Sequence, residues 1–363
     1  MALPSETKTW ADIQATTIEN YRPMFYDQVT DAIPMIKVMK DRGSVILEGG
    51  DGINETLMYR HSDAIKSFSG YDAMPLVPQD VLTVAKYDWA DIAGSWGYSQ
   101  DEVNRNRSKE QMKSLAKARI KQLKLSFNST INEMLYGDGT GNDGKDIQGL
   151  AKIVSDSATN TVGGVSKTAN AWFRNVSYCY DTCDGATAVG QGARQGGTLN
   201  TQSVRQHLAN VGGDDNYDTT YLMCLDHVFE EVCFGDTGPH FGVCDYAAMQ
   251  RLKHTMYTYK RFDMNDTGEA DPGFRHVKFN GIPIIFDRAM PTTTNGTSTC
   301  VSRMYFLNMD FMNWYIHSGE NFRTTEVYSL LPQQKAYVGL MFLKSQLTSP
   351  KPNAQAVIHS LFA

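Results

Sequence analysis

The sequence predicts an α+β fold, in which helices and strands occupy separate stretches of the chain. A long helical pattern runs from Ser99 to Tyr136 without a proline or glycine. Strand patterns rich in β-branched and aromatic residues precede this helix, and a further series of short strand patterns fills the C-terminal part of the chain. With 363 residues, the chain is long enough for two or three domains.

The composition narrows the class of protein. Hydrophobic residues make up 41% of the chain and charged residues 20%, which suits a soluble globular protein. The formal net charge of -6 argues against a dedicated DNA-binding protein. We expect no secretion signal, because no basic stretch followed by an apolar core opens the chain. The longest apolar run, residues 336–343, is too short to span a bilayer, so we expect no membrane partner.

The helical pattern from Ser99 to Tyr136 has defined ends. Ser99 and Glu102 fit a capping box, and Gly137 is expected to end the helix as a left-handed cap. A helix of this length would be roughly 55 Å long, so it is expected to run across a domain. Its apolar side chains recur every three or four residues, at Met112, Ala116, Ile120, Leu123, Phe127, Ile131 and Met134.

Basic residues dominate the polar side of this helix and form a stripe, which we call the basic stripe. Two interpretations remain open. The stripe is either a solvated face that keeps the helix soluble, or a surface that meets a polyanion such as nucleic acid without reading its sequence. Its members are Lys109, Lys113, Lys117, Lys121 and Lys124.

Before the helix, strand patterns at residues 45–47, 54–60 and 81–89 flank a turn region at 67–80 that contains two prolines and a glycine. The simplest construction is a long two-stranded arm with this turn at its tip. An isolated two-stranded ribbon is marginal in water, so its large apolar groups should be buried on a partner. The alternative is an ordinary hairpin folded onto its own core. The side chains expected to be exposed on the arm are Phe68, Tyr71, Met74, Leu76, Tyr87, Trp89 and Trp96.

The glycine-rich stretch 137–146 matches three ligand motifs incompletely. Residues 139–145 fit G-x-x-x-x-G-K, but Asp146 stands where a P-loop needs Ser or Thr. The pattern G-x-G-x-x-G is also present, but a helix precedes it, so the negative end of the helix dipole would face any phosphate. A calcium loop would need glycine at position six and a closing glutamate. We therefore expect a turn, with no cofactor bound.

The later part of the chain alternates between helical and strand patterns. A glycine-rich stretch at 185–197 is expected to mark a domain boundary or a loop. Asn280-Gly281 between two apolar runs predicts a hairpin over 277–287. Helices are expected at 200–209, 226–234 and 246–256, and strands at 221–225, 304–308, 314–317, 322–328 and 335–347.

No pattern in the sequence indicates catalysis or a metal site. G-x-S-x-G and H-E-x-x-H are both missing, and His227 and His254 are expected to be structural. Cys179 and Cys183 are four residues apart, but no second pair has ligand spacing, so no zinc site is expected. Without a secretion signal, the six cysteines are expected to be reduced thiols. We expect no catalytic, cofactor-binding or metal-binding residues and no enzymatic activity.

The order of segments resembles the major capsid protein of tailed bacteriophages, a fold shared with encapsulin shells. That order is an N-terminal arm, a β-arm, a long helix, a glycine-rich turn, an α+β domain and a strand-rich return. Short sequence segments support the resemblance. The matching segments are Ser69-Gly70-Tyr71-Asp72, Pro78-Gln79-Asp80, Tyr87-Asp88-Trp89, Gly149-Leu150, Thr161-Val162-Gly163-Gly164, Trp172-Phe173-Arg174-Asn175 and Asn280-Gly281-Ile282-Pro283-Ile284.

The resemblance implies a division of the chain. Residues 1–45 would form an N-terminal arm, and 46–98 an extended β-arm (E-loop) that lies over a neighbouring subunit. Residues 99–189 would form a peripheral domain with its spine helix at 99–136. Residues 190–310 would form an axial domain, and 311–363 would return to the peripheral domain as C-terminal strands.

The resemblance also implies a function. The chain would be a structural subunit that assembles into hexamers and pentamers of an icosahedral capsid around a double-stranded DNA genome. It would assemble in the host cytoplasm and reside in the virion. The basic stripe would face the packaged DNA non-specifically. Scaffolding would need a separate protein or none, since the N-terminal segment is short, and portal and decoration proteins would be further partners. The alternatives are an encapsulin-like nanocompartment shell and a soluble α+β enzyme.

Overall fold

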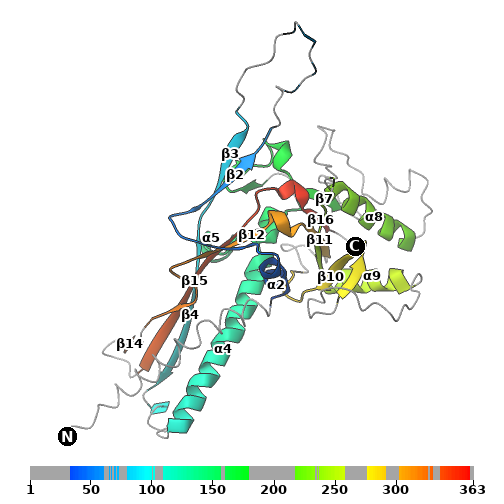
Figure 1. Cartoon of the computed structure of the whole chain (residues 1–363). Coiled ribbons are helices and arrows are strands. Elements are labelled where there is room, and N and C mark those ends of the chain that lie inside the picture. The colour runs from blue at the N-terminus through cyan, green and yellow to red at the C-terminus, as the bar shows by residue number, and fades with distance from the viewer. Residues whose placement is uncertain are drawn as a thin grey trace, which may run out of the picture.

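The computed structural model places two six-stranded sheets side by side, each packed against helices (Figure 1). A two-stranded ribbon leaves the body at one end, and the longest helix extends to the other. The structure describes residues 33–60, 65, 67, 69–70, 72, 80–99, 101–102, 109–156, 160–179, 217–233, 235, 237–257, 276–291, 302–325, 328–329 and 336–359.

The first sheet is built around one long strand, β15 (Ala336–Thr348). Along one side β15 pairs antiparallel with β4 (Ala90–Ser99) over the whole length of β4. On its other side β15 pairs with β12, β13 and β14, and β12 pairs in turn with β1. These remaining strands are β1 (Val45–Glu48), β12 (Asn313–His317), β13 (Arg323–Thr324) and β14 (Tyr328–Ser329).

Helix α4 (Lys109–Tyr136) lies along β4 (Figure 1). Its buried side chains recur at Leu123, Phe127, Ile131 and Leu135, so three of the predicted positions are confirmed. The predicted Met134 is only half-buried, and the side chains of Met112, Ala116 and Ile120 lie outside the described part. At 28 residues, the described helix is about 42 Å long. A side chain at Gly94 of β4 would collide with Phe127, so this glycine lets the helix approach the strand closely.

The predicted N-terminal capping box is confirmed, whereas the predicted C-terminal cap is wrong. Glu102 N donates to Ser99 Oγ at 3.2 Å, and Ser99 N donates to Glu102 Oε2 at 3.3 Å. Residues 103–108, which the helix was predicted to include, lie outside the described part. At the other end, Gly137 N donates to Met134 O and tightens the last turn. Gly139 takes the left-handed conformation instead, with φ 78°.

The second sheet has the order β7-β16-β11-β8-β10-β9. Helices α8 (Tyr217–Val232) and α9 (Tyr246–Tyr257) lie beside it (Figure 1). Every residue of its central strand β11 is buried, with Met304 and Phe306 in one core and Tyr305 and Leu307 in the other. The strands are β7 (Val176–Cys179), β8 (Phe241–Cys244), β9 (His276–Phe279), β10 (Ile282–Phe286), β11 (Arg303–Leu307) and β16 (Ala356–His359).

Two local predictions in this region had opposite outcomes. The hairpin is confirmed, since β9 and β10 pair antiparallel and both turn residues, Asn280 and Gly281, have positive φ. The strand predicted at 221–225 is wrong, whereas the helix predicted at 226–234 is confirmed up to Val232 but begins earlier, at Tyr217. Residues 221–232 lie in one helix, α8, which buries Tyr221, Leu225 and Val228 at helical spacing. A short apolar run does not distinguish a buried strand from one turn of a buried helix.

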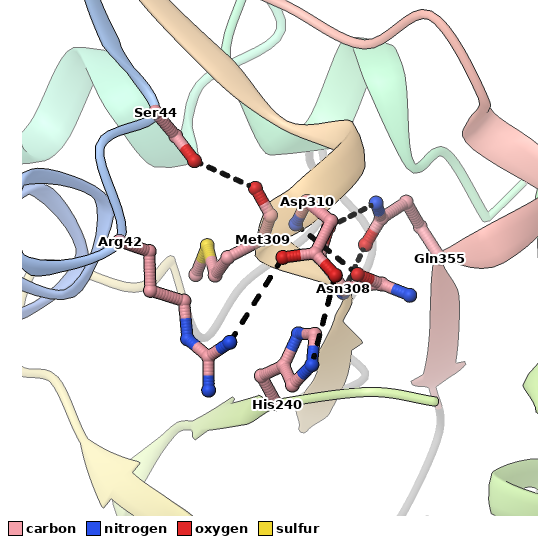
Figure 2. Close-up of polar contacts among 7 residues, drawn as sticks. All are labelled: Arg42, Ser44, His240, Asn308, Met309, Asp310 and Gln355. Carbon is pink, nitrogen blue, oxygen red and sulfur yellow. Dashed lines mark hydrogen bonds and ion pairs between the residues drawn. The ribbon is translucent and has the colours of Figure 1, made fainter. Parts of the chain in front are cut away.

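Two short connections carry the chain between the two sheets, and they are bonded together (Figure 2). One connection is η2 (Met309–Phe311), between β11 and β12, and the other is η3 (Pro352–Ala354), between β15 and β16. Gln355 Oε1 accepts from Asn308 N at 2.7 Å, and Gln355 Nε2 donates to Asn308 O at 2.8 Å. Ser44 Oγ adds a bond to Met309 O at 2.8 Å, so three distant segments meet at this junction.

Charged groups extend the same junction. Asp310 lies 3.9 Å from Arg42 and 3.8 Å from His240 (Figure 2). Burial lowers the pKa of His240, and the charge of Arg42 lowers it further, whereas Asp310 and Asn308 act in the opposite direction. The junction therefore joins the segment before β1 of the first sheet to the residue before β8 of the second through several weak contacts.

The shorter elements complete the body. Helix α2 starts with a proline and contacts β12, and the hairpin β5–β6 precedes η1. No helix within the described residues is long and apolar enough to cross a membrane. The bounds of these elements are α2 (Pro34–Asp41), α5 (Gly141–Gly144), α6 (Leu150–Ile153), β5 (Thr161–Val162), β6 (Val165–Ser166) and η1 (Ala171–Phe173).

The sheets cut across the domain division expected from the resemblance. Strands β1 and β4, assigned to the E-loop range 46–98, belong to the first sheet. Strands β7 and β16, assigned to the peripheral domain, belong to the second sheet together with the strands of 190–310. The division itself remains a prediction. Most of the N-terminal arm (1–32), the glycine-rich stretch 185–197 and the helix predicted at 200–209 lie outside the described residues.

Candidate inter-subunit interface

The two-stranded ribbon consists of β2 (Ile53–Met58) and β3 (Leu82–Tyr87), paired antiparallel along their whole length. Successive side chains of a strand point to opposite faces, so the ribbon has an inner and an outer face. The inner face packs into the hydrophobic core that α4 forms with the first sheet, which we call the first core. It does so through Ile53, Leu57, Ala85 and Tyr87, each at most 2% exposed.

A buried acidic side chain fastens the inner face to the first sheet. Glu55 Oε1 accepts a hydrogen bond from Thr348 Oγ1 at 2.8 Å and another from Asn313 Nδ2 at 3.3 Å. Tyr87 adds a bond from its hydroxyl to Ser349 O at 3.3 Å, and burial raises its pKa far above the ordinary value. The base of the ribbon is therefore fixed on the body by both apolar packing and hydrogen bonds.

The β5–β6 hairpin supports the ribbon from another side. Lys86 N donates to Gly163 O at 2.9 Å, and a side chain at Gly163 would collide with Ala85 and Tyr87. The hairpin is held by Lys167, a fully buried lysine whose Nζ donates to Ile153 O and to Asn175 Oδ1, both at 2.7 Å. Burial, and to a lesser extent the charge of Lys152, lower the pKa of Lys167 to about 7.

The outer face of the ribbon is apolar and exposed toward the tip. Met58 is 67% exposed, Leu82 52% and Val84 47%. Met58 and Leu82 are directly opposite each other in the ladder, and Val84 is opposite Thr56. Ile65, farther toward the tip, is 88% exposed. We call Met58, Leu82 and Val84 the outer apolar face. The prediction selected aromatic residues and missed this face, although the alternation of side chains along β2 and β3 could have identified it.

The residues predicted to contact a neighbouring copy have different outcomes. Phe68, Tyr71, Met74 and Leu76 lie outside the described residues, so their role stays a prediction. The expected exposure of Tyr87 is wrong, because its side chain points to the inner face and lies in the core.

The two tryptophans that were expected to be exposed on the arm have different outcomes. Trp96 is 7% exposed and belongs to the first core. Trp89 is half-buried, with its ring edge against His317 at a centroid distance of 5.3 Å and Nε1 bonded to Gly50 O. Trp96 belongs to β4 of the first sheet rather than to the ribbon, so its expected exposure on the arm is wrong. The contact predicted for Trp89 with a neighbouring copy remains a prediction.

The basic stripe is only partly described. All five lysines lie in α4, but the side chains of Lys109, Lys113 and Lys117 are outside the described part. Lys121 is exposed and Lys124 is half-buried. Whether the stripe faces nucleic acid stays a prediction.

The glycine-rich turn after α4 uses its polar groups internally. Asp138 Oδ1 accepts from both the backbone N and Oγ1 of Thr140, which lowers the pKa of Asp138, and Asp146 accepts from Asn142. Among the described residues, no group of three or more His, Cys, Asp or Glu side chains could hold a metal ion. Cys183 and the side chain of Cys179 lie outside the described part.

Comparisons with known proteins give matches among solved structures only. No protein-family model matches the sequence, and no curated protein matches it. The capsid asymmetric unit of cyanophage A-1(L) is similar at a TM-score of 0.59 and 14% identity, covering 90% of this chain and 92% of that one. The capsid of a native GTA particle is similar at a TM-score of 0.50 and 11% identity, covering 89% of each chain.

These likenesses extend over about nine-tenths of each chain rather than over a single motif. An encapsulin complex from Synechococcus elongatus reaches a TM-score of only 0.47, from which we conclude nothing. The mixed helix and sheet architecture agrees with the α+β prediction. The chain therefore has the major-capsid fold found in these phage and GTA capsid subunits.

Proposed function

We propose that this chain is the major capsid subunit of a tailed bacteriophage, which assembles into hexamers and pentamers of an icosahedral shell around double-stranded DNA. The observation that carries the proposal is the capsid fold, which extends over nearly the whole chain. The protein acts as a structural subunit rather than as an enzyme, and it resides in the virion after assembly in the host cytoplasm.

The outer apolar face supports self-assembly independently of the fold. Met58, Leu82 and Val84 lie on one side of a ribbon that is fastened to the body by its other side. Exposed apolar groups gathered on one face mark interaction sites, and burying them on a second copy removes them from water. The predicted contact residues Phe68, Tyr71, Met74 and Leu76 would extend this surface along the tip, and Trp89 would lie at its base.

The basic stripe is proposed to face the packaged DNA through non-specific contacts with phosphates. Lysines at every fourth position of a helix align along one side, which suits a charged surface without sequence readout. Scaffolding, portal and decoration proteins would be separate partners of such a shell.

Electron microscopy of the purified protein tests the proposal. We expect closed shells, or hexamers and pentamers that persist at moderate salt, and nuclease-protected DNA in shells isolated from infected cells. A monodisperse monomer under all assembly conditions would overturn the proposal. Shells that contain a protein cargo and no DNA would instead establish the nanocompartment alternative.

A further inference from the structure

One edge of the first sheet is open among the described residues. Strand β4 pairs with β15 along its whole length, and no described strand pairs with its other edge. An edge of ten residues presents a long row of backbone N–H and C=O groups. Such a row is a template for an additional strand.

A groove of about 280 Å³ follows this open edge. It is lined by six consecutive residues of β4, positions 92–97, and no residue of β15 contributes to it. Because residues from both faces of β4 line the groove while its partner strand does not, the groove opens at the unpaired edge. The opposite wall is one stripe of α4, whose polar members are Arg119, Gln122, Ser126 and Thr130.

The sequence of β4 favours pairing at this edge. Proteins usually protect long edges with lysine, proline, a bulge or a covering element. Positions 92–97 contain neither lysine nor proline, and Ala93, Gly94, Ser95 and Gly97 leave the backbone accessible. A six-residue stretch of strand is about 20 Å long, enough for a short added strand held by main-chain hydrogen bonds.

We propose that the N-terminal segment of the same chain, residues 1–32, binds in this groove and adds an extended strand to the open edge of β4. The segment is acidic, with five acidic and two basic side chains, whereas α4 carries six basic and two acidic ones. Charge complementarity therefore favours the segment beside the helix. The proposal is independent of whether the chain forms a shell.

The length of residues 1–32 and the place where they join the body favour binding within one chain over binding to a second copy. Residue Ile33, where the segment joins the body, is buried in the core cluster that also contains Ile92, Leu123 and Phe127 at the groove. An extended segment of 32 residues reaches about 105 Å. Binding within one chain also has a high effective concentration, which association with another copy lacks.

Hydrogen exchange of unassembled subunits tests whether the edge is covered. Peptides covering 92–97 should exchange at least tenfold faster in a chain that lacks residues 1–32, while peptides covering β12 stay unchanged. A full-length triple variant, Asp12→Lys with Glu19→Lys and Asp27→Lys, should show a smaller increase in the same peptides. This variant keeps the chain length, so it remains informative if the truncated chain does not fold. Equal exchange in all folded variants would overturn the proposal.

Carbodiimide cross-linking of mixed ¹⁴N and ¹⁵N chains tests the source of the strand. We expect carboxylates of residues 1–32 to link to α4 lysines, including the exposed Lys121, in peptide pairs of a single isotope. Pairs that combine both isotopes would place another copy's segment in the groove and contradict the proposal. Cross-links from residues 65–80 to α4, with none from 1–32, would also contradict it.

Discussion

The two faces of the β2–β3 ribbon have opposite relations to the rest of the molecule. The apolar side chains of the inner face, Ile53, Leu57, Ala85 and Tyr87, are buried against the body, and Glu55 and Tyr87 add hydrogen bonds to Thr348 and Ser349. The outer face is apolar toward the tip and remains exposed. Both faces belong to the same two strands, because successive side chains point to opposite sides. Backbone structure alone therefore cannot account for the difference in exposure between the two faces. The exposed apolar groups of the outer face are the basis of the proposed contact with a second copy.

The largest expected effect comes from adding charge to the outer apolar face. The double variant Met58→Lys with Leu82→Lys should form no shells in electron micrographs, because two desolvated charges in an interface cost several kcal/mol. Its unfolding midpoint should stay within the range of the unaltered protein, since both side chains are exposed. Asn54→Ala, at an exposed outer position near the base, is the matched control and should assemble. Normal shells from the double variant would show that this face is no interface.

Truncating the inner face should damage the fold instead. Tyr87→Ala removes a fully buried ring and its bond to Ser349 O, so the free energy of unfolding should fall by about 3–5 kcal/mol. Denaturant unfolding of the unassembled subunit measures this loss. An unchanged stability would mean that the ribbon is not fastened to the body in solution.

Lys167 should make the support of the ribbon sensitive to pH. Its pKa is about 7 in the folded chain, against about 10.4 when unfolded. Between these values the unfolded chain binds more protons, so the contribution of Lys167 to stability increases as pH rises. From pH 7 to pH 9 the unaltered protein should gain about 2 kcal/mol relative to Lys167→Met. Parallel stability curves for the two proteins would show that the buried amine keeps its ordinary pKa.

The smallest effect is expected at the polar anchor of the inner face. Glu55→Gln keeps the acceptor oxygen for Thr348 and Asn313 but removes its charge. Hydrogen bonds to a charged group are stronger than those to a neutral one, so about 1 kcal/mol of stability should be lost. Thermal unfolding measures the loss, and shell formation should persist. Loss of shells with unchanged stability would instead give Glu55 a role in assembly.

Local sequence signals correctly predicted the elements whose structure depends on near neighbours. The capping box of Ser99 and Glu102, the Asn280-Gly281 hairpin and the apolar period of α4 are each set by residues within a few positions. The order of such segments also sufficed to predict the capsid fold.

Only the tertiary structure determined which apolar residues the chain covers by itself. The run at 221–225 is helical because α8 packs beside β7 and β16 at helical spacing. Tyr87 is buried because Ser349, 262 positions away, lies against it, whereas Met58 on the same ribbon has no such cover. Burial depends on contacts between residues far apart in the chain, and a local pattern records the polarity of a side chain without recording what will lie against it.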